Sequence, residues 1–357
     1  MALQNDWSPD WAVHPGDVLA DHLEARGWSQ AEFSRLSGLS PKLISTVISG
    51  SNPVSSETAL KLERVLGMKA HIWTGIQSDW DLHQARQASE GEDVDAFVAD
   101  FPVKELKVRG VLPNTKDKSV LLDSLLHFFS IGTPEALSAR MANLAVHHRQ
   151  SKAFRTNANH VAAWLLLGER QARDMDLPPF NFDAFAGAIR SIRALTMNEP
   201  EDFYPEMVEL CRKAGVALVL EKPISKTCVF GSARWLDRDR AIIQMSLRMK
   251  TNDHFWWTFF HEAAHITLHR GRNFADDKGG EGDGLEAQAD AWAENILVGS
   301  RRFAAFKATR PKSESAVRSF AGEVGVHPGI VVGMLQHHRV LPFTHLNGLK
   351  ERFELSE

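Results

Sequence analysis

The chain has 357 residues, of which 43% are hydrophobic and 24% are charged, and its formal net charge at pH 7 is −4. These values are typical of an ordinary globular protein of two or three domains, and the charge gives no general bias toward polyanions. The two cysteines, Cys211 and Cys228, do not form a CxxC motif, so neither a disulfide framework nor a cysteine metal site is indicated.

The N-terminus lacks the basic start and the apolar core of an export signal. Apolar runs such as residues 162–167 are too short to span a membrane. We therefore expect a cytoplasmic protein that has no membrane partner.

Helix start and stop signals in the first part of the chain predict five short helices. We place them over residues 14–26, 30–37, 41–48, 57–66 and 70–83. Ser29 can cap the second helix, because Glu32 follows at the capping-box spacing. Gly38 opens a tight turn between the second and third helices. Short helices joined in this way are typical of a helix-turn-helix motif.

This segment resembles the XRE-type DNA-binding domain, in the version found in HigA-type antitoxins. The residues that carry the resemblance are His14-Pro15-Gly16, Gly27-Trp28-Ser29-Gln30-Ala31-Glu32, Gly38-Leu39-Ser40-Pro41, Ser49-Gly50 and Ala59-Leu60-Lys61-Leu62. The resemblance implies that operator DNA is a partner.

The start of the third helix would enter the major groove, which makes Lys42, Ser45 and Thr46 candidate contacts to bases or backbone. Gln30, at the start of the second helix, is a candidate phosphate contact. Residues 1–90 nevertheless contain seven Lys or Arg against eleven Asp or Glu, a formal charge of −4. Non-specific DNA affinity should therefore be poor. Either a homodimer binds a specific operator through few contacts, or these five helices mainly bind protein.

The middle of the chain carries weaker signals. Residues 85–117 mix Gly, Asp, Glu and Lys and are predicted to be a connector. Helices are expected over residues 119–129, 135–148 and 158–172, with a bridging or dimerising role. We therefore divide the chain into a helix-turn-helix domain (1–90), a connector and bridging region (91–180) and a metal-binding domain (181–357).

The last domain should open with helices over residues 183–195 and 204–214. Short strands rich in Val and Ile are predicted over residues 215–220, 227–230 and 241–245. The fold class is thus α+β and predominantly helical, with an all-α domain followed by a domain with a small sheet. An edge strand of this sheet could bind an extended peptide by strand addition. An ordinary α+β core is the alternative.

The strongest chemical motif is His261-Glu262-Ala263-Ala264-His265, preceded by a run in which five of six residues are aromatic. On a helix, residues four apart project from one face, so both imidazoles can reach one metal ion. Glu262 lies at the flank, where it can hold and activate water. This is the HExxH signature of zinc hydrolases. The alternative is a core helix with two hydrogen-bonded histidines.

A zinc site needs a third protein ligand. A helix beginning near Leu285 offers Glu286, with Asp290 one turn further on, where it can accept a hydrogen bond from a ligating His. His269 is expected to support the site or pack at the helix end, although it could be a fourth ligand. The loop between the two helices holds competing candidate ligands at Asp276, Asp277, Glu281 and Asp283. We favour a solvated loop for these residues, because Gly-rich segments are hard to order.

These motifs resemble the ImmA/IrrE family of metallo-endopeptidases over roughly residues 185–300. The residues that carry the resemblance are the runs 261–269 and 286–293, together with 231–236 and 242–248. The resemblance implies a zincin-like domain with one zinc ion per chain. In it, His261, His265 and Glu286 bind the metal, and Glu262 is the general base.

Near the C-terminus, residues 324–331 echo the turn at residues 37–44. A second helix-turn-helix shape is therefore expected there. It could read nucleic acid or, as we favour, serve as a packing element of the metal-binding domain.

Together, the two resemblances imply a transcriptional regulator with a zinc-dependent endopeptidase domain that cleaves a repressor or another partner protein. The group that stabilises the oxyanion is not evident, and Tyr204, His254 and Arg248 remain open. The alternative function is an antitoxin-like repressor that binds an operator and a toxin, with a metal domain that is sensory or structural.

Overall fold

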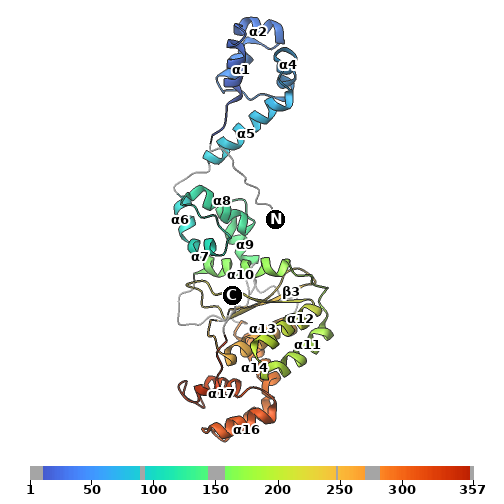
Figure 1. The fold of residues 1–357 in the computed structure, drawn as a ribbon, viewed down its shortest axis with the longest axis vertical. Coiled ribbons are helices and arrows are strands. Elements are labelled where there is room, and N and C mark those ends of the chain that lie inside the picture. The colour runs from blue at the N-terminus through green and yellow to red at the C-terminus, as the bar shows by residue number, and fades with distance from the viewer. Residues whose placement is uncertain (1–10, 89–92, 144–156, 247, 270–281, 354–357) are drawn as a thin grey trace. The chain divides into compact units, whose positions relative to one another are not determined.

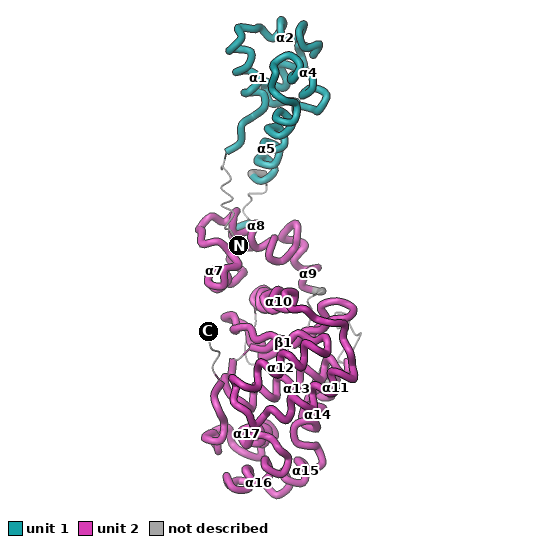
Figure 2. The backbone as a smooth tube through the Cα atoms, turned by 45° about the vertical axis from the view of Figure 1, so that its right-hand side comes forward, with its two compact units in different colours: residues 1–94 teal, residues 95–357 magenta. Residues whose placement is uncertain are grey.

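The computed structural model describes residues 11–88, 93–143, 157–246, 248–269 and 282–353. The chain divides into two compact units, residues 1–94 and 95–357 (Figure 2). Each unit has a hydrophobic core of its own.

The described part of the first unit consists of five helices. They are α1 (Pro15–Glu24), α2 (Gln30–Ser37), α3 (Pro41–Ile48), α4 (Ser56–Leu66) and α5 (Ala70–Ala88). The predicted capping box is present, since the Ser29 side chain accepts from the Glu32 N–H and the Glu32 carboxylate accepts from the Ser29 N–H. Gly38 ends α2 at a φ of 67°, a conformation that favours glycine. The predicted helix-turn-helix is confirmed.

The core of this unit joins all five helices around fully buried large side chains. Phe33 from α2, Ile44 from α3 and Trp73 from α5 are each 1% exposed or less. Burial of these apolar side chains stabilises one packing arrangement of α2 and α3. The outward face of α3 is therefore presented on a rigid support.

The second unit begins with helices that the sequence analysis missed. Residues 85–117 were predicted to be a connector, but they include the end of α5, α6 (Asp93–Ala99) and α7 (Val103–Val108). Val98, Phe101 and Leu106 are buried. The connector prediction was wrong because apolar residues that alternate with charged ones are buried here, and Phe101 packs against Phe129 of the next helix.

Two further elements follow in this region. They are α8 (Lys118–Phe129) and α9 (Leu137–Asn143), with a 3-10 turn, η1 (Pro134–Ala136), between them. Only residues up to 143 of the predicted helix 135–148 fall within the described part of the chain.

Among the described residues, the strands form one three-stranded sheet in the order β1-β3-β2. β1 (Val216–Leu220) runs parallel to β3 (Ala241–Met245), and β2 (Gly231–Trp235) runs antiparallel to β3. The strand predicted over residues 227–230 was wrong, because the strand begins at Gly231. Thr227 is instead held in a turn, where its hydroxyl donates to the Ile224 carbonyl.

Helices cover both faces of this sheet (Figure 1). On one face, Ala217, Val219 and Ile242 share a core with the end of α10 (Ala158–Arg173). On the other, Val216, Leu218 and Ile243 share a core with the helices that follow α10 in the chain. This alternation follows from the period of two along a strand, and it explains why β1 and β3 are almost continuously apolar.

The larger core belongs to α11 (Phe182–Ala194), α12 (Pro200–Lys213), α13 (Asn252–Leu268) and α14 (Gly282–Val298). The 3-10 turn η2 (Leu195–Met197) links α11 to the segment before α12. α13 carries the HExxH motif and is bordered by β2, α14 and α17. The predominantly helical α+β prediction is confirmed.

The remaining elements close the domain. They are α15 (Ser300–Ala308), α16 (Glu314–Val324), α17 (Pro328–His337) and the 3-10 turn η4 (Asn347–Leu349). Gly325, at a φ of 68°, turns the chain between α16 and α17, as the sequence echo predicted. Ile330, Val331 and Leu335 of α17 are buried in the core that α17 shares with α13. The second helix-turn-helix shape, formed by α16 and α17, is therefore a packing element. No helix in the described part of the chain combines the length and apolarity needed to cross a membrane.

Candidate metal centre

The two histidines of the HExxH motif lie on one face of α13, inside the domain. The side chains of His261 and His265 are 2% and 4% exposed. Trp256, Phe259 and Phe260 are buried around the same helix, so the aromatic run fixes the helix in the core. Burial of two polar rings is costly unless each ring nitrogen has a partner.

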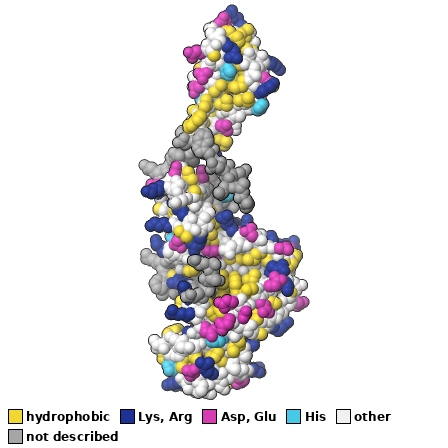
Figure 3. All heavy atoms as spheres, viewed as in Figure 1, with side chains coloured by type: hydrophobic (Ala, Val, Ile, Leu, Met, Phe, Trp, Pro, Cys, Tyr) yellow, Lys and Arg dark blue, Asp and Glu magenta, His cyan; other side chains and the backbone are white. Residues whose placement is uncertain are grey.

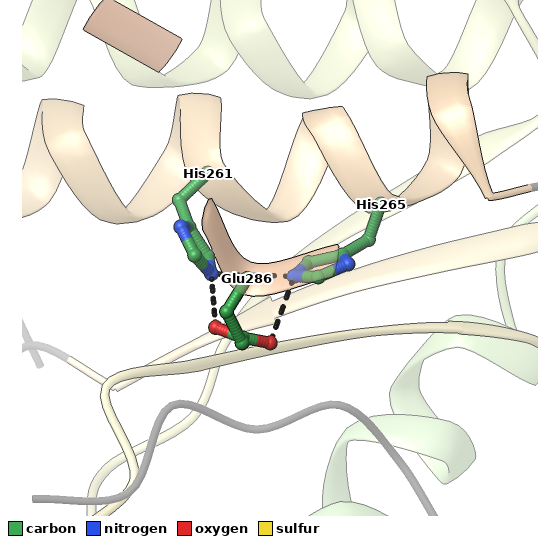
Figure 4. A group of neighbouring side chains, drawn as sticks. All are labelled: His261, His265 and Glu286. Atoms are coloured by element: carbon green, nitrogen blue, oxygen red, sulfur yellow. Dashed lines mark hydrogen bonds and ion pairs between the residues drawn. The ribbon is translucent and has the colours of Figure 1, made fainter. Parts of the chain in front are cut away.

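α14 brings a carboxylate to these rings (Figure 4). The Nε2 atoms of His261 and His265 lie 3.2 Å apart. Glu286 places one oxygen 3.1 Å from the first Nε2 and the other 3.4 Å from the second. Donors about 2.0–2.1 Å from a tetrahedral zinc ion are about 3.3–3.4 Å from one another. The His₂Glu donor set therefore fits zinc in both chemistry and spacing.

The second nitrogen of His261 is held by α14 as well. Its Nδ1 lies 2.9 Å from Asp290 Oδ1, and because a carboxylate accepts, Nδ1 donates. This leaves the Nε2 lone pair directed toward the other donors. Asp290 therefore has the geometry of the supporting residue that the sequence predicted.

The charges of this cluster favour a cation between the donors. Burial lowers the pKa of His261, but hydrogen bonds to Asp290 and Glu286 outweigh it and raise the pKa to about 9. Burial likewise opposes ionisation of Glu286, yet the two imidazoles hold its pKa well below the ordinary value. A carboxylate that stays ionised in this setting is suited to binding a metal ion.

His265 has a different support. Its Nδ1 lies 3.0 Å from Nδ1 of His269, whose Nε2 lies 3.3 Å from Gln288 Oε1. When the Nε2 of His265 serves as the metal donor, its Nδ1–H can donate to His269, and His269 can donate to Gln288. Within the described residues, His269 is not part of the group whose donor atoms converge, so it lies behind the ligand.

Gln288 was not predicted as a site residue. Its position two residues after Glu286 gives no signal on its own, because only the packing of α14 against α13 reveals its contact. Of the alternative ligands in the preceding loop, Asp276, Asp277, Glu281 and the side chain of Asp283 lie outside the described residues.

Glu262 lies against β2, an edge strand of the sheet. It is 1% exposed. A Cβ atom built on Gly231 would lie 2.7 Å from Glu262 Oε1 and 2.7 Å from Thr258 Cγ2. The backbone of β2 thus passes directly over the carboxylate, and only glycine allows this approach. Gly231 entered the sequence prediction only as part of the family resemblance.

The three candidates for oxyanion stabilisation have other contacts. Tyr204 lies on α12, and burial raises its pKa to about 12 against the opposing effect of a hydrogen bond at Leu220 of β1. Arg248 donates to the Thr227 carbonyl at 2.7 Å. His254 lies on α13 seven residues before His261, about 10 Å along the helix axis.

In the first unit, the candidate DNA contacts lie on and beside α3. Gln30, Lys42 and Ser45 are exposed, whereas Thr46 is half-buried. The Thr46 hydroxyl lies 2.9 Å from the Lys42 carbonyl and accepts from Asn52 Nδ2 at 2.9 Å. Thr46 therefore positions Asn52, an exposed side chain that the sequence analysis missed. An Asn directly after the Gly50-Ser51 turn was the available signal.

The charge of this unit is mixed rather than basic. On the face shown in Figure 3, acidic and basic side chains are both present and hydrophobic side chains lie among them. This agrees with the formal charge of −4 over residues 1–90, from seven basic and eleven acidic side chains.

Comparisons with known proteins concern part of the chain. A family model described as "Helix-turn-helix" matches residues 19–73, the segment that contains α2, α3 and α4. The uncharacterized HTH-type transcriptional regulator YddM of Escherichia coli is 30% identical over 73 residues, which are 20% of this chain and 78% of that protein. Virulence-associated protein I of Dichelobacter nodosus is 29% identical over 84 residues, 23% of this chain and 78% of that protein.

A solved structure is also similar. It is described as an antidote protein of a plasmid maintenance system from Nostoc punctiforme, with 32% sequence identity and a TM-score of 0.21. The similarity covers 22% of this chain and 85% of the other.

Proposed function

The chain belongs to the helix-turn-helix family, and on that premise we propose that it is a transcriptional regulator whose second unit is a zinc-dependent endopeptidase. The regulator YddM, which the chain resembles, supports the first half of the proposal. The second half rests on one observation: His261, His265 and Glu286 bring three donor atoms together at the mutual distances of a zinc ligand set. The resemblance of the same motifs to ImmA/IrrE metallo-endopeptidases adds to it.

The donor set suits a hydrolase. Three protein ligands leave one position of a tetrahedral ion for water or substrate. When bound, zinc would supply a Lewis acid that polarises a carbonyl and lowers the pKa of water. His₂Glu sites of this kind are the catalytic type rather than the closed structural type.

The protein's own residues would then provide the rest of the chemistry. Asp290 orients the ring of His261, and His269 with Gln288 orients the ring of His265. Glu262 would take a proton from the attacking water at a carboxylate oxygen and deliver it to the leaving amine. Because β2 lies at an edge of the sheet directly over Glu262, an extended peptide can add to this strand and pass the same carboxylate.

In the first unit, α3 would lie in the major groove, with Lys42 and Ser45 on its outer side and Asn52 beside it in the following turn. Few basic residues mean weak non-specific binding, so regulation would depend on a specific operator. Cleavage of a repressor or another partner protein would couple the peptidase to transcription.

Glu262→Gln tests the proposal. The amide keeps the size of the side chain but cannot accept a proton, so we expect zinc to be retained and peptide cleavage to fall at least about a hundredfold. Zinc content, and cleavage of a peptide library read by mass spectrometry, would measure both. Glu314→Gln, in an exposed ion pair with Arg318 on α16, is the matched control.

If Glu262→Gln leaves cleavage and transcriptional regulation as in the wild type, the peptidase proposal is wrong. An antitoxin-like repressor, with a sensory or structural metal domain, would then be the better account.

A further inference from the structure

A cavity of about 180 Å³ opens beside α13, close to Glu262. Its walls come from α13, α17, the residue before β2 and the segment after α17. Phe230, Trp257 and Phe343 contribute aromatic side chains, and Ile330 and Met334 contribute aliphatic ones. The imidazole rings of His254 and His337 also line it. A cavity of about 150 Å³ with apolar walls is large enough to hold benzene. The volume here therefore suits one six-membered aromatic ring.

One end of the cavity is built from a buried ion pair. Lys350 Nζ lies 2.6 Å from Asp253 Oδ2 and 2.8 Å from Gln336 Oε1, and the Asp253 side chain is 6% exposed. A Cβ atom on Gly333 would lie only 2.4 Å from Asp253 Oδ2, so glycine lets α17 approach α13 here. Since the pair is neutral overall, it closes the cavity without selecting a charged group.

The cavity adjoins the proposed peptidase site at Thr258. Thr258 lines it and also lies against Gly231, which in turn lies against Glu262. Thr258 and Glu262 are four residues apart on α13, so about 6 Å along the helix axis separates them. A peptide added to β2 past Glu262 would therefore place a side chain next to the scissile bond at the mouth of this cavity.

We propose that this cavity is the specificity pocket of the peptidase and that it takes an aromatic side chain of the substrate, adjacent to the bond that is cut. The inference rests on the proposed endopeptidase function. Apolar and aromatic walls favour a ring over a polar or charged side chain, and the volume excludes much larger groups. The substrate class is thus a polypeptide with Phe or another single-ring aromatic residue at this position.

The test compares binding and cleavage in the full chain loaded with zinc. N-acetyl-phenylalanine amide is titrated into the Glu262→Gln protein by NMR, with N-acetyl-alanine amide as the reference ligand. Cleavage by the wild type is measured on two peptides that differ only in Phe or Ala beside the scissile bond. We expect Phe to be preferred at least about tenfold in both measurements.

Two variants test whether the preference for Phe arises from this cavity. Met334→Trp fills the cavity, and Phe343→Ala removes a wall residue that is 72% exposed and is therefore dispensable for folding. Both should abolish the preference for Phe. Phe182→Ala, a half-exposed aromatic residue on α11 that does not line the cavity, should keep it.

The outcomes separate this inference from the peptidase proposal. If the wild type cuts peptides with no preference for Phe, or if Phe343→Ala and Met334→Trp both keep the preference, the pocket assignment is overturned while the peptidase stands. If the phenylalanine amide binds in this cavity but no peptide is ever cut, the peptidase has failed, and with it the assignment as a substrate pocket.

Discussion

At the scale of single residues, the two ring nitrogens of each motif histidine have separate partners. The Nε2 atoms of His261 and His265 face Glu286, while their Nδ1 atoms face Asp290 and His269 respectively. The second nitrogen therefore fixes the tautomer and the direction of the first. The residues behind the ligands should affect metal affinity without being essential for it.

His269→Ala should weaken zinc binding about tenfold, because His265 loses the partner that orients it. His265→Ala should abolish stoichiometric zinc, because a ligand is lost. Competition with a chromophoric chelator measures both affinities. His338→Ala, which removes a histidine that pairs with Glu294 near the surface, is the control and should bind zinc normally. Equal losses in His269→Ala and His265→Ala would mean that His269 is itself a ligand.

Gly231→Ala should reduce peptide cleavage at least about tenfold while zinc stays bound. The added methyl group would meet Glu262 and Thr258, so the general base and the strand must move apart. Overpacking of this kind should also cost about 1–3 kcal/mol of stability. Activity, zinc content and thermal unfolding are measured together.

Gly284→Ala in α14 is the matched control, since a Cβ there meets nothing within 4 Å. It should leave both activity and stability unchanged or improve stability slightly. A Gly231→Ala enzyme with full activity would show that the close approach of β2 to Glu262 does not matter.

At the scale of elements, α3 and the turn after it form the candidate DNA-reading surface. Lys42 and Ser45 point outward because Ile44 and Val47 point into the core. Asn52 is added to this surface by its bond to Thr46. The helix therefore provides a short polar face rather than a basic one.

Lys42→Ala and Asn52→Ala should each weaken binding of the full chain to its operator about tenfold, as expected for the loss of one specific contact. Fluorescence anisotropy on an operator fragment selected in vitro measures the effect. Lys61→Ala, which removes a lysine paired with Glu57 on α4, is the control. Unchanged operator affinity in both α3-face variants would place the DNA-binding surface elsewhere or favour a protein-binding role.

Elements were predicted best where their signals are local. Ser29, Gly38 and Pro41 marked the ends of α2 and α3 correctly, because capping involves residues within one turn. The start of β2 and the helices α6 and α7 were missed. Whether a short apolar segment becomes a strand, a turn or a helix depends on the surface against which it packs.

At the scale of the whole molecule, the two units have separate cores, so they should respond separately to metal removal. Zinc binds only the folded second unit in our proposal, and a ligand at 100 times its Kd stabilises the folded state by about 2.7 kcal/mol. A chelator should therefore lower one melting transition of the full chain and leave the other in place. Differential scanning calorimetry distinguishes the two.

His265→Ala should already melt at the lower temperature and be insensitive to the chelator. The stabilisation by zinc should also shrink as the pH falls, because protons compete with the metal for His261 and His265. A chelator that shifts neither transition, or both equally, would contradict the assignment of zinc to the second unit alone.

The sequence by itself determined the local parts of this protein: the capped helices of the helix-turn-helix, the helix that carries His261 and His265, and the placement of Glu286 on the following helix. The tertiary structure decided which groups meet. It brought Gln288 to His269, Gly231 to Glu262, and α17 to α13 to form a cavity. The physical reason is that caps and helical faces depend on neighbours within a few residues. Contacts between distant segments depend instead on how whole helices and strands pack.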